Sequence, residues 1–157
     1  MESAVFEIVA YHAWHQARFE ELNRQWIEKY FSMEPIDFEV LQHPEEYILK
    51  TGGKIFVAEV NGEVAGTVAL KKVNAAIYEM TKMAVDEKFR GRKIGQSLAT
   101  ASLSWAEEAG AEKIILYSST KLPTAIALYR KLGFREIAVD GPYQRSDIKM
   151  ELNLNDN

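Results

Sequence analysis

One segment, residues 79–110, constrains the fold more than any other part of the chain. It starts with a short apolar run, Met80–Val85, continues as a basic loop, Asp86–Lys93, and then shows helical periodicity. Apolar residues recur in this last part at intervals of three or four, which predicts a helix over Ile94–Ala109. They are Ile94, Leu98, Ala101, Trp105 and Ala109. Gly110 follows, where a left-handed residue ends a helix easily. The segment therefore predicts a buried strand, a tight loop and a helix.

The loop brings positive charge to the start of this helix. Residues 82–93 hold five cations and two acids, within a chain whose formal net charge is -4. The cations are Lys82, Lys88, Arg90, Arg92 and Lys93, and the acids are Asp86 and Glu87. The first N–H groups of a helix have no partner inside the helix and carry a partial positive charge, so they suit an anion, above all a phosphate. The local charge favours a small anionic ligand at this one place.

Known phosphate-binding loops differ in their glycine spacing. A nucleotide P-loop needs two glycines around four residues and then Lys-Ser/Thr, which the chain lacks, and a dinucleotide fingerprint needs a third glycine beside Gly91 and Gly95. The segment Arg90–Gly95 resembles the acyl-CoA pyrophosphate loop of the GNAT N-acetyltransferase superfamily, Gln/Arg-x-x-Gly-x-Gly/Ala. Lys93 replaces its first glycine, and we expect ordinary helical dihedral angles there. A solvated basic turn is the alternative interpretation of the loop alone.

Length, charge and residue types exclude several classes of protein. With 157 residues, the chain suits a single domain over residues 1–157. A pI of about 5.5 does not favour nucleic acid. The chain has no cysteine, which excludes disulfides, thiolate zinc sites and a cysteine nucleophile, and its three histidines are too scattered for a metal site. No signal peptide and no apolar run of roughly 20 residues is present, so we expect a cytoplasmic protein without a membrane partner.

Periodicity and turn residues outline the remaining elements. We expect strands over 5–11, 54–60, 63–73, 75–85, 113–117, 134–139 and 146–154, and helices over 13–31 and 123–132, with a shorter one broken near Pro44. Asn61-Gly62 between two strand-like runs is a strong hairpin signal, because both turn residues take a positive φ. A strand, a helix and a strand in the order 80–85, 94–109, 113–117 suggest a parallel pair with a crossover.

A second segment strengthens the resemblance. Residues 125–134 read AIALYRKLGF, which is similar to the other GNAT signature, a helix ending in LYxKxGF. The two segments occur in the family's order, and the element order matches over essentially the whole chain, so the chain resembles a small GNAT member of bacterial type. The resemblance implies an α/β (α+β) fold with a mixed, mostly antiparallel sheet of about seven strands, a splayed central pair and four flanking helices. It also implies acetyl-CoA as co-substrate and no metal.

The resemblance implies roles for residues that match the two motifs. Met83 and Val85 match the strand that pairs with the pantetheine arm, and the Met83 N–H would polarise the thioester carbonyl. Tyr129 matches the tyrosine that protonates the departing CoA thiolate, although helical spacing also fits a core aromatic. Ser119 and Thr120 are the nearest polar substitutes for an asparagine that many members carry where this chain has Leu122. The expected cofactor-binding residues are Met83, Val85, Arg90, Gly91, Arg92, Lys93, Ile94, Gly95, Gln96, Ser119 and Tyr129.

Glu79 is the candidate base, because an amine must lose a proton to attack a thioester. Strand alternation places Glu79 on the same face as Met83, while an edge carboxylate paired with Lys82 or Lys71 is the plainer alternative. The loop before the second helix commonly shapes the acceptor site in the family, and acids there would suit a cationic amine. The expected acceptor-binding residues are Tyr30, Glu34 and Glu79, and Glu34 and Asp37 are weaker candidates than Glu79 for the base.

These features together predict an N-acetyltransferase. It would move an acetyl group from acetyl-CoA to a primary amine of a small molecule or peptide by direct attack. The alternative is a non-catalytic acyl-CoA-binding sensor or interaction module, and a nucleotide-binding regulator is disfavoured by the missing P-loop. The acceptor stays open among polyamines, aminoglycosides, amino acids and peptides. No nucleic acid is expected as a partner, and a homodimer is compatible with the family's habits.

Overall fold

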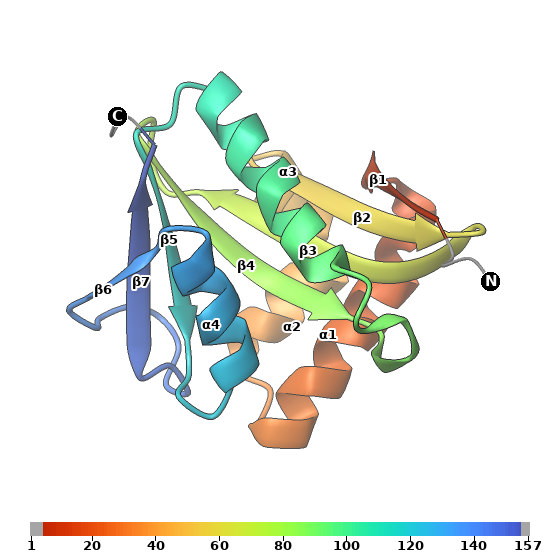
Figure 1. Cartoon of the computed structure of the whole chain (residues 1–157). Helices are drawn as coiled ribbons and strands as arrows, with labels where there is room; N and C mark the ends of the chain where they lie inside the picture. The colour runs from red at the N-terminus through yellow and green to blue at the C-terminus, as the bar shows by residue number, and fades with distance from the viewer. Residues whose placement is uncertain (1–4, 155–157) are drawn as a thin grey trace.

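The computed structural model of the protein describes residues 5–154 (Figure 1). Its strands are β1 (Phe6–Ala10), β2 (Lys54–Val60), β3 (Glu63–Lys72), β4 (Ile77–Val85), β5 (Lys113–Ser118), β6 (Arg135–Ile137) and β7 (Ile148–Asn153). Its main helices are α1 (Gln16–Tyr30), α2 (Pro35–Gln42), α3 (Ile94–Glu108) and α4 (Pro123–Lys131). Single turns of 3-10 or π helix cover Ala13–His15, Glu45–Leu49 and Glu87–Phe89. The expected elements are therefore present, with ends that move by a few residues.

The strands form one mixed sheet between two layers of helix. Their order is β1-β2-β3-β4-β5-β7-β6, and every neighbouring pair is antiparallel except β4 and β5, which are parallel. Helices α3 and α4 cover one face, and α1 and α2 cover the other (Figure 1). The Asn61-Gly62 turn joins β2 to β3 with a positive φ at both residues, as predicted. The expected seven-stranded sheet with four helices is confirmed.

The central pair of strands separates partway along its length. β4 and β5 pair only over Ile77–Glu79 and Lys113–Ile115, and beyond these residues the strands diverge (Figure 1). β5 meanwhile stays paired with β7 along its whole length, from Lys113 to Ser118. The carboxyl half of β4 therefore has no strand partner on its β5 side within residues 5–154.

A β-bulge interrupts β4 at Lys82. Ala69 of β3 lies opposite Thr81 and Thr67 lies opposite Ala84, so β4 holds one residue more than β3 between these pairs. Lys82 takes a left-handed conformation with φ 54°. The Thr67 hydroxyl donates a hydrogen bond to the Lys82 carbonyl at 3.1 Å and accepts one from Asn23 of α1 at 3.1 Å. Helix α1 thus fixes the bulge through a buried polar contact.

The bulge changes which side chains share a face of β4. Met80, before the bulge, belongs to the core under α3, and Met83 and Val85, after it, also pack against that core. Ala84 belongs instead to the core under α1 and α2. The prediction that Glu79 and Met83 share a face is therefore wrong, because the extra residue resets the alternation on which it rested.

The basic loop also differs from expectation in one residue. Helix α3 begins at Ile94, as predicted, but Lys93 before it takes φ 62° and ψ 24°. The expectation of ordinary helical dihedral angles at Lys93 is therefore wrong. Lys93 takes the left-handed conformation that glycine adopts freely. For a residue with a Cβ this conformation is less stable by about 1 kcal/mol. Together with Gly91, at φ 84°, it turns the chain sharply into α3.

A buried cluster of charges joins α2, the bulge and the loop 138–147. The Asp37 carboxylate accepts hydrogen bonds from Lys82 Nζ at 2.9 Å and from Arg145 Nη1 and Nη2 at 2.7 and 2.8 Å. Burial would raise the pKa of Asp37, but Arg145 and Lys82 outweigh it and hold this pKa at about 2. Glu34 accepts from the main-chain N–H groups of Gln144 and Arg145. The loop is thereby anchored over the bulge.

Replacing Asp37 by asparagine leaves the buried Lys82 ammonium without a carboxylate partner and leaves Arg145 with Glu34 alone. We expect Asp37→Asn to lower the free energy of unfolding at pH 7 by about 3 kcal/mol, measured by urea denaturation. The folded-state pKa of Asp37 lies below the ordinary 3.8, so its stabilisation is present above pH 3.8 and is lost as pH falls toward 2. The difference in free energy of unfolding between wild type and variant should therefore become smaller as pH falls from 3.8 toward 2.

The matched control makes the same change at an exposed ion pair. Asp140 contacts Lys149 at 2.7 Å, and its side chain is 74% exposed. Asp140→Asn should lower the free energy of unfolding by less than about 1 kcal/mol. Equal losses in the two variants would contradict the structural role given to Asp37.

Candidate active site

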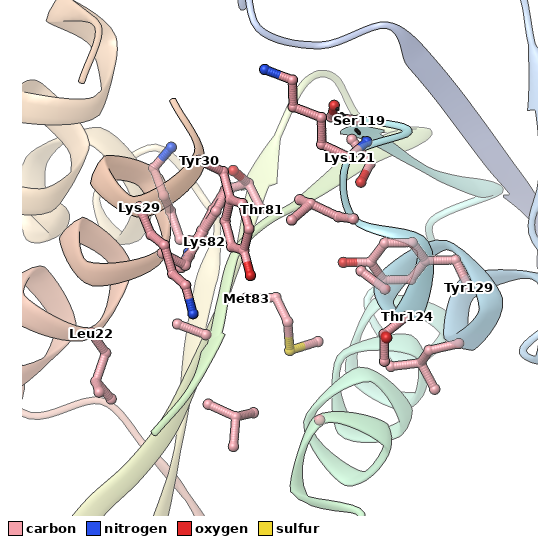
Figure 2. Close-up of a pocket in the computed structure, with 18 of the residues that line it drawn as sticks. Leu22, Lys29, Tyr30, Thr81, Lys82, Met83, Ser119, Lys121, Thr124 and Tyr129 are labelled. Carbon is pink, nitrogen blue, oxygen red and sulfur yellow. Dashed lines mark hydrogen bonds between the residues drawn. The ribbon is translucent and has the colours of Figure 1, made fainter. Parts of the chain in front are cut away.

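A cavity of about 830 Å³ opens where β4 and β5 separate. Its walls come from the carboxyl halves of both strands, the end of α1, the start of α3, the helix α4 and the loop 138–147 (Figure 2). This volume is typical of sites for organic ligands of cofactor size. The cavity is therefore a consequence of the strand divergence and is large enough for an extended ligand.

One end of the cavity is formed by the basic loop and the start of α3. Every expected cofactor-binding residue lines the cavity except Arg92. Main-chain N–H groups in the first turn of α3 have no partner within the helix, so this end favours an anion. Arg92 instead places its guanidinium over the Phe89 ring, 5.4 Å from the centroid, and its Nη1 is buried without a hydrogen-bond partner among residues 5–154.

The middle of the cavity is bounded by the free side of β4. Met83 and Val85 line it after the bulge, where β4 pairs with β3 alone. An extended ligand could occupy the place of a strand there and use main-chain hydrogen bonds. Ser119, after β5, faces the cavity, whereas Thr120 is turned away to Asp147, whose carboxylate accepts from its N–H and hydroxyl at 2.8 and 2.7 Å. Leu122 also lines the wall.

Tyr129 belongs both to the core and to the cavity. Its ring packs edge-on against Phe134 with centroids 5.9 Å apart, and the residue is buried. Its hydroxyl points into the cavity toward Met83 (Figure 2). Burial raises the pKa of Tyr129 to about 12, so the phenol keeps its proton at neutral pH. The two interpretations of Tyr129 from the sequence therefore do not exclude each other.

Glu79 lies behind the cavity wall rather than on it. The residue is 5% exposed, and its carboxylate accepts a hydrogen bond from the Tyr143 hydroxyl at 3.1 Å. Tyr143 itself lines the cavity. Burial raises the pKa of Glu79, and neither Lys82 nor Lys71 forms a salt bridge with it in the described part of the chain. Glu79 can reach a ligand only through another group.

The remaining acceptor candidates occupy different places. Tyr30 lines the cavity from the end of α1, and its neighbour Phe31 does so too (Figure 2). Glu34 does not line the cavity, because its carboxylate is bound to the backbone of the loop 138–147. Asp37 is completely buried behind Lys82 and Arg145, which line the wall in its place.

Three polar residues on this wall, which contact Asp37 or Glu79, stand out among those that sequence analysis missed. They are Lys82, Tyr143 and Arg145. Lys82 had the pattern of an ordinary strand residue, and the segment 140–145 had no periodicity that could assign its side chains a direction. Only the identity of the loop residues, a tyrosine and an arginine beside a proline, was available as a signal.

Residues 5–154 contain neither a membrane-spanning helix nor a cluster of metal ligands. No helix there has the length and apolar character to cross a membrane. No group of three or more histidine, aspartate or glutamate side chains in that range is arranged to hold a metal ion.

Solved structures share this fold closely. A GNAT-family acetyltransferase from Staphylococcus aureus Mu50 superposes with a TM-score of 0.89 at 22% identity, covering 96% of this chain and all of the other. A protein from Salmonella typhimurium, solved with its cofactor acetyl-CoA, gives a TM-score of 0.76 at 18% identity, covering 97% and 95% of the two chains. At these identities, the similarity establishes the fold alone.

Sequence comparison establishes the family. N-acetylaspartate synthetase from Mus musculus is 32% identical over 101 residues, which is 63% of this chain and 34% of that protein, so the chain spans about a third of this curated relative. Residues 11–134 match the acetyltransferase (GNAT) family. This match covers most of the chain and both segments that carried the resemblance. The chain is a member of the GNAT acetyltransferase family.

Proposed function

We propose that this chain transfers the acetyl group of acetyl-CoA to a primary amine by direct attack of the amine. One observation carries the proposal: a single cavity joins the helix N-terminus of α3, the free side of β4 and the Tyr129 hydroxyl. These are the three features that a diphosphate, an amide-containing arm and a departing thiolate need. The acetyl-CoA in the Salmonella relative supports the same assignment, as does family membership.

The cofactor would lie across the mouth of the strand gap. Its diphosphate would accept hydrogen bonds from main-chain N–H groups between Arg90 and Gln96, where the helix dipole and nearby cations favour negative charge. Its pantetheine arm would pair with β4 at Met83 and Val85. The Met83 N–H would then face the thioester oxygen and stabilise the charge that develops on it.

The transfer needs two proton movements. The amine nitrogen bonds to the thioester carbon, the carbon–sulfur bond breaks, and the sulfur leaves as a thiolate. Tyr129 would donate its phenolic proton to this sulfur as negative charge develops on it. Burial raises the pKa of Tyr129, so the phenol is protonated when the transfer begins. The amine loses its own proton to a separate group, and Tyr129 regains a proton from solvent once the products leave.

Glu79 would receive the amine proton indirectly. Tyr143 lines the cavity and donates its hydroxyl proton to Glu79, so a proton accepted on the Tyr143 oxygen would release the other one to the carboxylate. Burial raises the pKa of Glu79, which makes this carboxylate a stronger base than an exposed one. Glu79 would then act through Tyr143, without touching the substrate.

Gly95→Ala tests the placement of the diphosphate. An added Cβ at Gly95 would meet only Val85 and Leu128 side chains, at 3.7 and 3.8 Å, which are ordinary contacts. Alanine in a helix should leave stability unchanged or raise it by up to about 1 kcal/mol. The methyl group would instead occupy cavity space, so we expect CoA affinity in calorimetry to fall at least tenfold. Unchanged affinity would place the diphosphate elsewhere.

Tyr129→Phe tests the acid. The ring and its packing on Phe134 remain, and only the cavity-facing hydroxyl is lost. We expect kcat to fall about 10²-fold while the CoA dissociation constant changes less than threefold. Phe134→Leu provides a control that alters packing without removing a hydroxyl. If Tyr129→Phe turns over at the wild-type rate, Tyr129 is not the acid.

Glu79→Gln tests the proton route. Glutamine keeps an oxygen that can accept from Tyr143 but cannot take up a proton. We expect kcat to fall at least tenfold at pH 7, with loss of the pH dependence that Glu79 contributes. Because the folded-state pKa of Glu79 is raised, wild-type activity should rise with pH as this group ionises, above its ordinary range. An identical pH–rate profile in the variant would remove Glu79 from the mechanism.

A further inference from the structure

We propose that the acceptor carries a carboxylate beside its amine, as an α-amino acid does, and that Lys82 binds this carboxylate. The inference rests on the proposed function and names its substrate class. It starts from the charges that line the cavity and from one buried ammonium group with unused hydrogen-bond donors.

The charged side chains on the cavity wall are almost all positive. Beyond the basic loop, the wall contains Lys29, Lys82, Lys121 and Arg145. Among the described residues that line it, Glu87 is the only carboxylate, and it already contacts Lys29 at 3.3 Å. A polyamine would meet cations without acids to receive its charges. An anionic group on the acceptor would find complementary charge.

Lys82 offers the best-defined donor of this set. Its side chain is 1% exposed, and within residues 5–154 its ammonium has one hydrogen-bond partner, Asp37, at 2.9 Å. An ammonium group has three N–H donors, and a buried donor without a partner is costly. Lys82 also lines the cavity, so the oxygens of a bound carboxylate could satisfy the donors that Asp37 leaves free.

Aromatic and charged side chains surround the Lys82 ammonium. The Lys82 ammonium lies 5.1 Å from the Tyr143 ring centroid, and the Arg145 guanidinium stacks over the same ring at 4.9 Å. The acids that balance these cations, Asp37 and Glu34, stand behind them and do not line the cavity. A ligand would therefore meet the cations first, in a fixed arrangement.

Lys82 directly precedes Met83 in β4, and the Met83 N–H would hold the reacting carbonyl. The Lys82 side chain runs toward Asp37 of α2, whereas Met83 packs on the α3 side of the sheet, so the carboxylate site and the reaction site are next to each other in sequence and are separated by the length of the lysine side chain. An α-amino acid is the simplest acceptor that carries both an amine and a carboxylate, and it is therefore the first class to test.

The test compares matched acceptors with the unmodified protein and acetyl-CoA. We would measure kcat/KM by thiol release for each L-amino acid, for its amide, for the corresponding amine without a carboxyl group, and for spermidine. The amide amine is the less basic, so more of it is neutral and intrinsic reactivity favours the amide. We expect kcat/KM for at least one free amino acid to exceed kcat/KM for its amide tenfold or more.

The outcomes separate the two proposals. If amides or spermidine react as well as or better than every free amino acid, the carboxylate inference is wrong and the acetyltransferase proposal stands. If CoA binds but no amine in the panel is acetylated, the carboxylate inference is wrong. The acetyltransferase proposal fails too when aminoglycosides and peptide N-termini also release no thiol, which favours a binding module. If CoA produces no heat in calorimetry, the proposed function itself fails.

A variant tests the assignment to Lys82. Lys82→Met keeps the length and apolar stem but removes the donors, and we expect the preference for acid over amide to fall toward one through a higher KM for the acid. CoA affinity should stay within threefold. Lys50→Met makes the same change at an exposed lysine away from the cavity and should keep the preference. An unaltered preference in Lys82→Met would assign the carboxylate to another group.

Discussion

The separation of β4 from β5 is the constraint on which the rest of the structure depends. The two strands share only three residue pairs, while β5 keeps six with β7, so the sheet opens between its central strands. This opening supplies both the cavity and the unpaired side of β4. Helices α3 and α4 then bring a helix N-terminus and Tyr129 to the same opening. A continuous sheet with the same helices would bury these groups without leaving a site.

The bulge at Lys82 adds a second function to the same strand. It directs Met83 and Val85 to the face of α3, and it lets Lys82 reach Asp37 on the face of α2. The buried charges are expensive to desolvate and are stable because each cation has a carboxylate partner. They also anchor the loop that carries Tyr143 and Arg145. Stability and the composition of this part of the cavity wall therefore depend on the same contacts.

Regular periodicity and turn chemistry made most of the fold predictable from the sequence. The helix from Ile94, the Asn61-Gly62 hairpin and the parallel crossover all follow from local patterns, and the family is confirmed. The bulge was not predictable, because Lys82 in an apolar run looks like any solvated strand residue. Its left-handed backbone depends on contacts with Thr67 and α1 that lie far away in the sequence. The prediction that Glu79 and Met83 share a face of β4 was wrong for this reason.

The site was predictable only where a motif fixed the backbone. The residues from Arg90 to Gln96, with Met83 and Tyr129, converge on the cavity except for Arg92. The side of the cavity proposed for the acceptor was not predictable. Glu34 and Asp37 look like free acids in the sequence, but in the structure they form ion pairs with Arg145 and Lys82. Arg145 comes from a loop more than 100 residues away and Lys82 from β4, 45 residues from Asp37, and no local pattern encodes these contacts.

A crystal structure of the protein with CoA measures the central claim most directly. The account predicts the diphosphate within hydrogen-bond distance of main-chain N–H groups in the first turn of α3. It also predicts the pantetheine arm paired with β4 after the bulge, and the sulfur beside the Tyr129 hydroxyl. Density for CoA on another surface, or a gap between β4 and β5 that stays empty at saturating CoA, would contradict it.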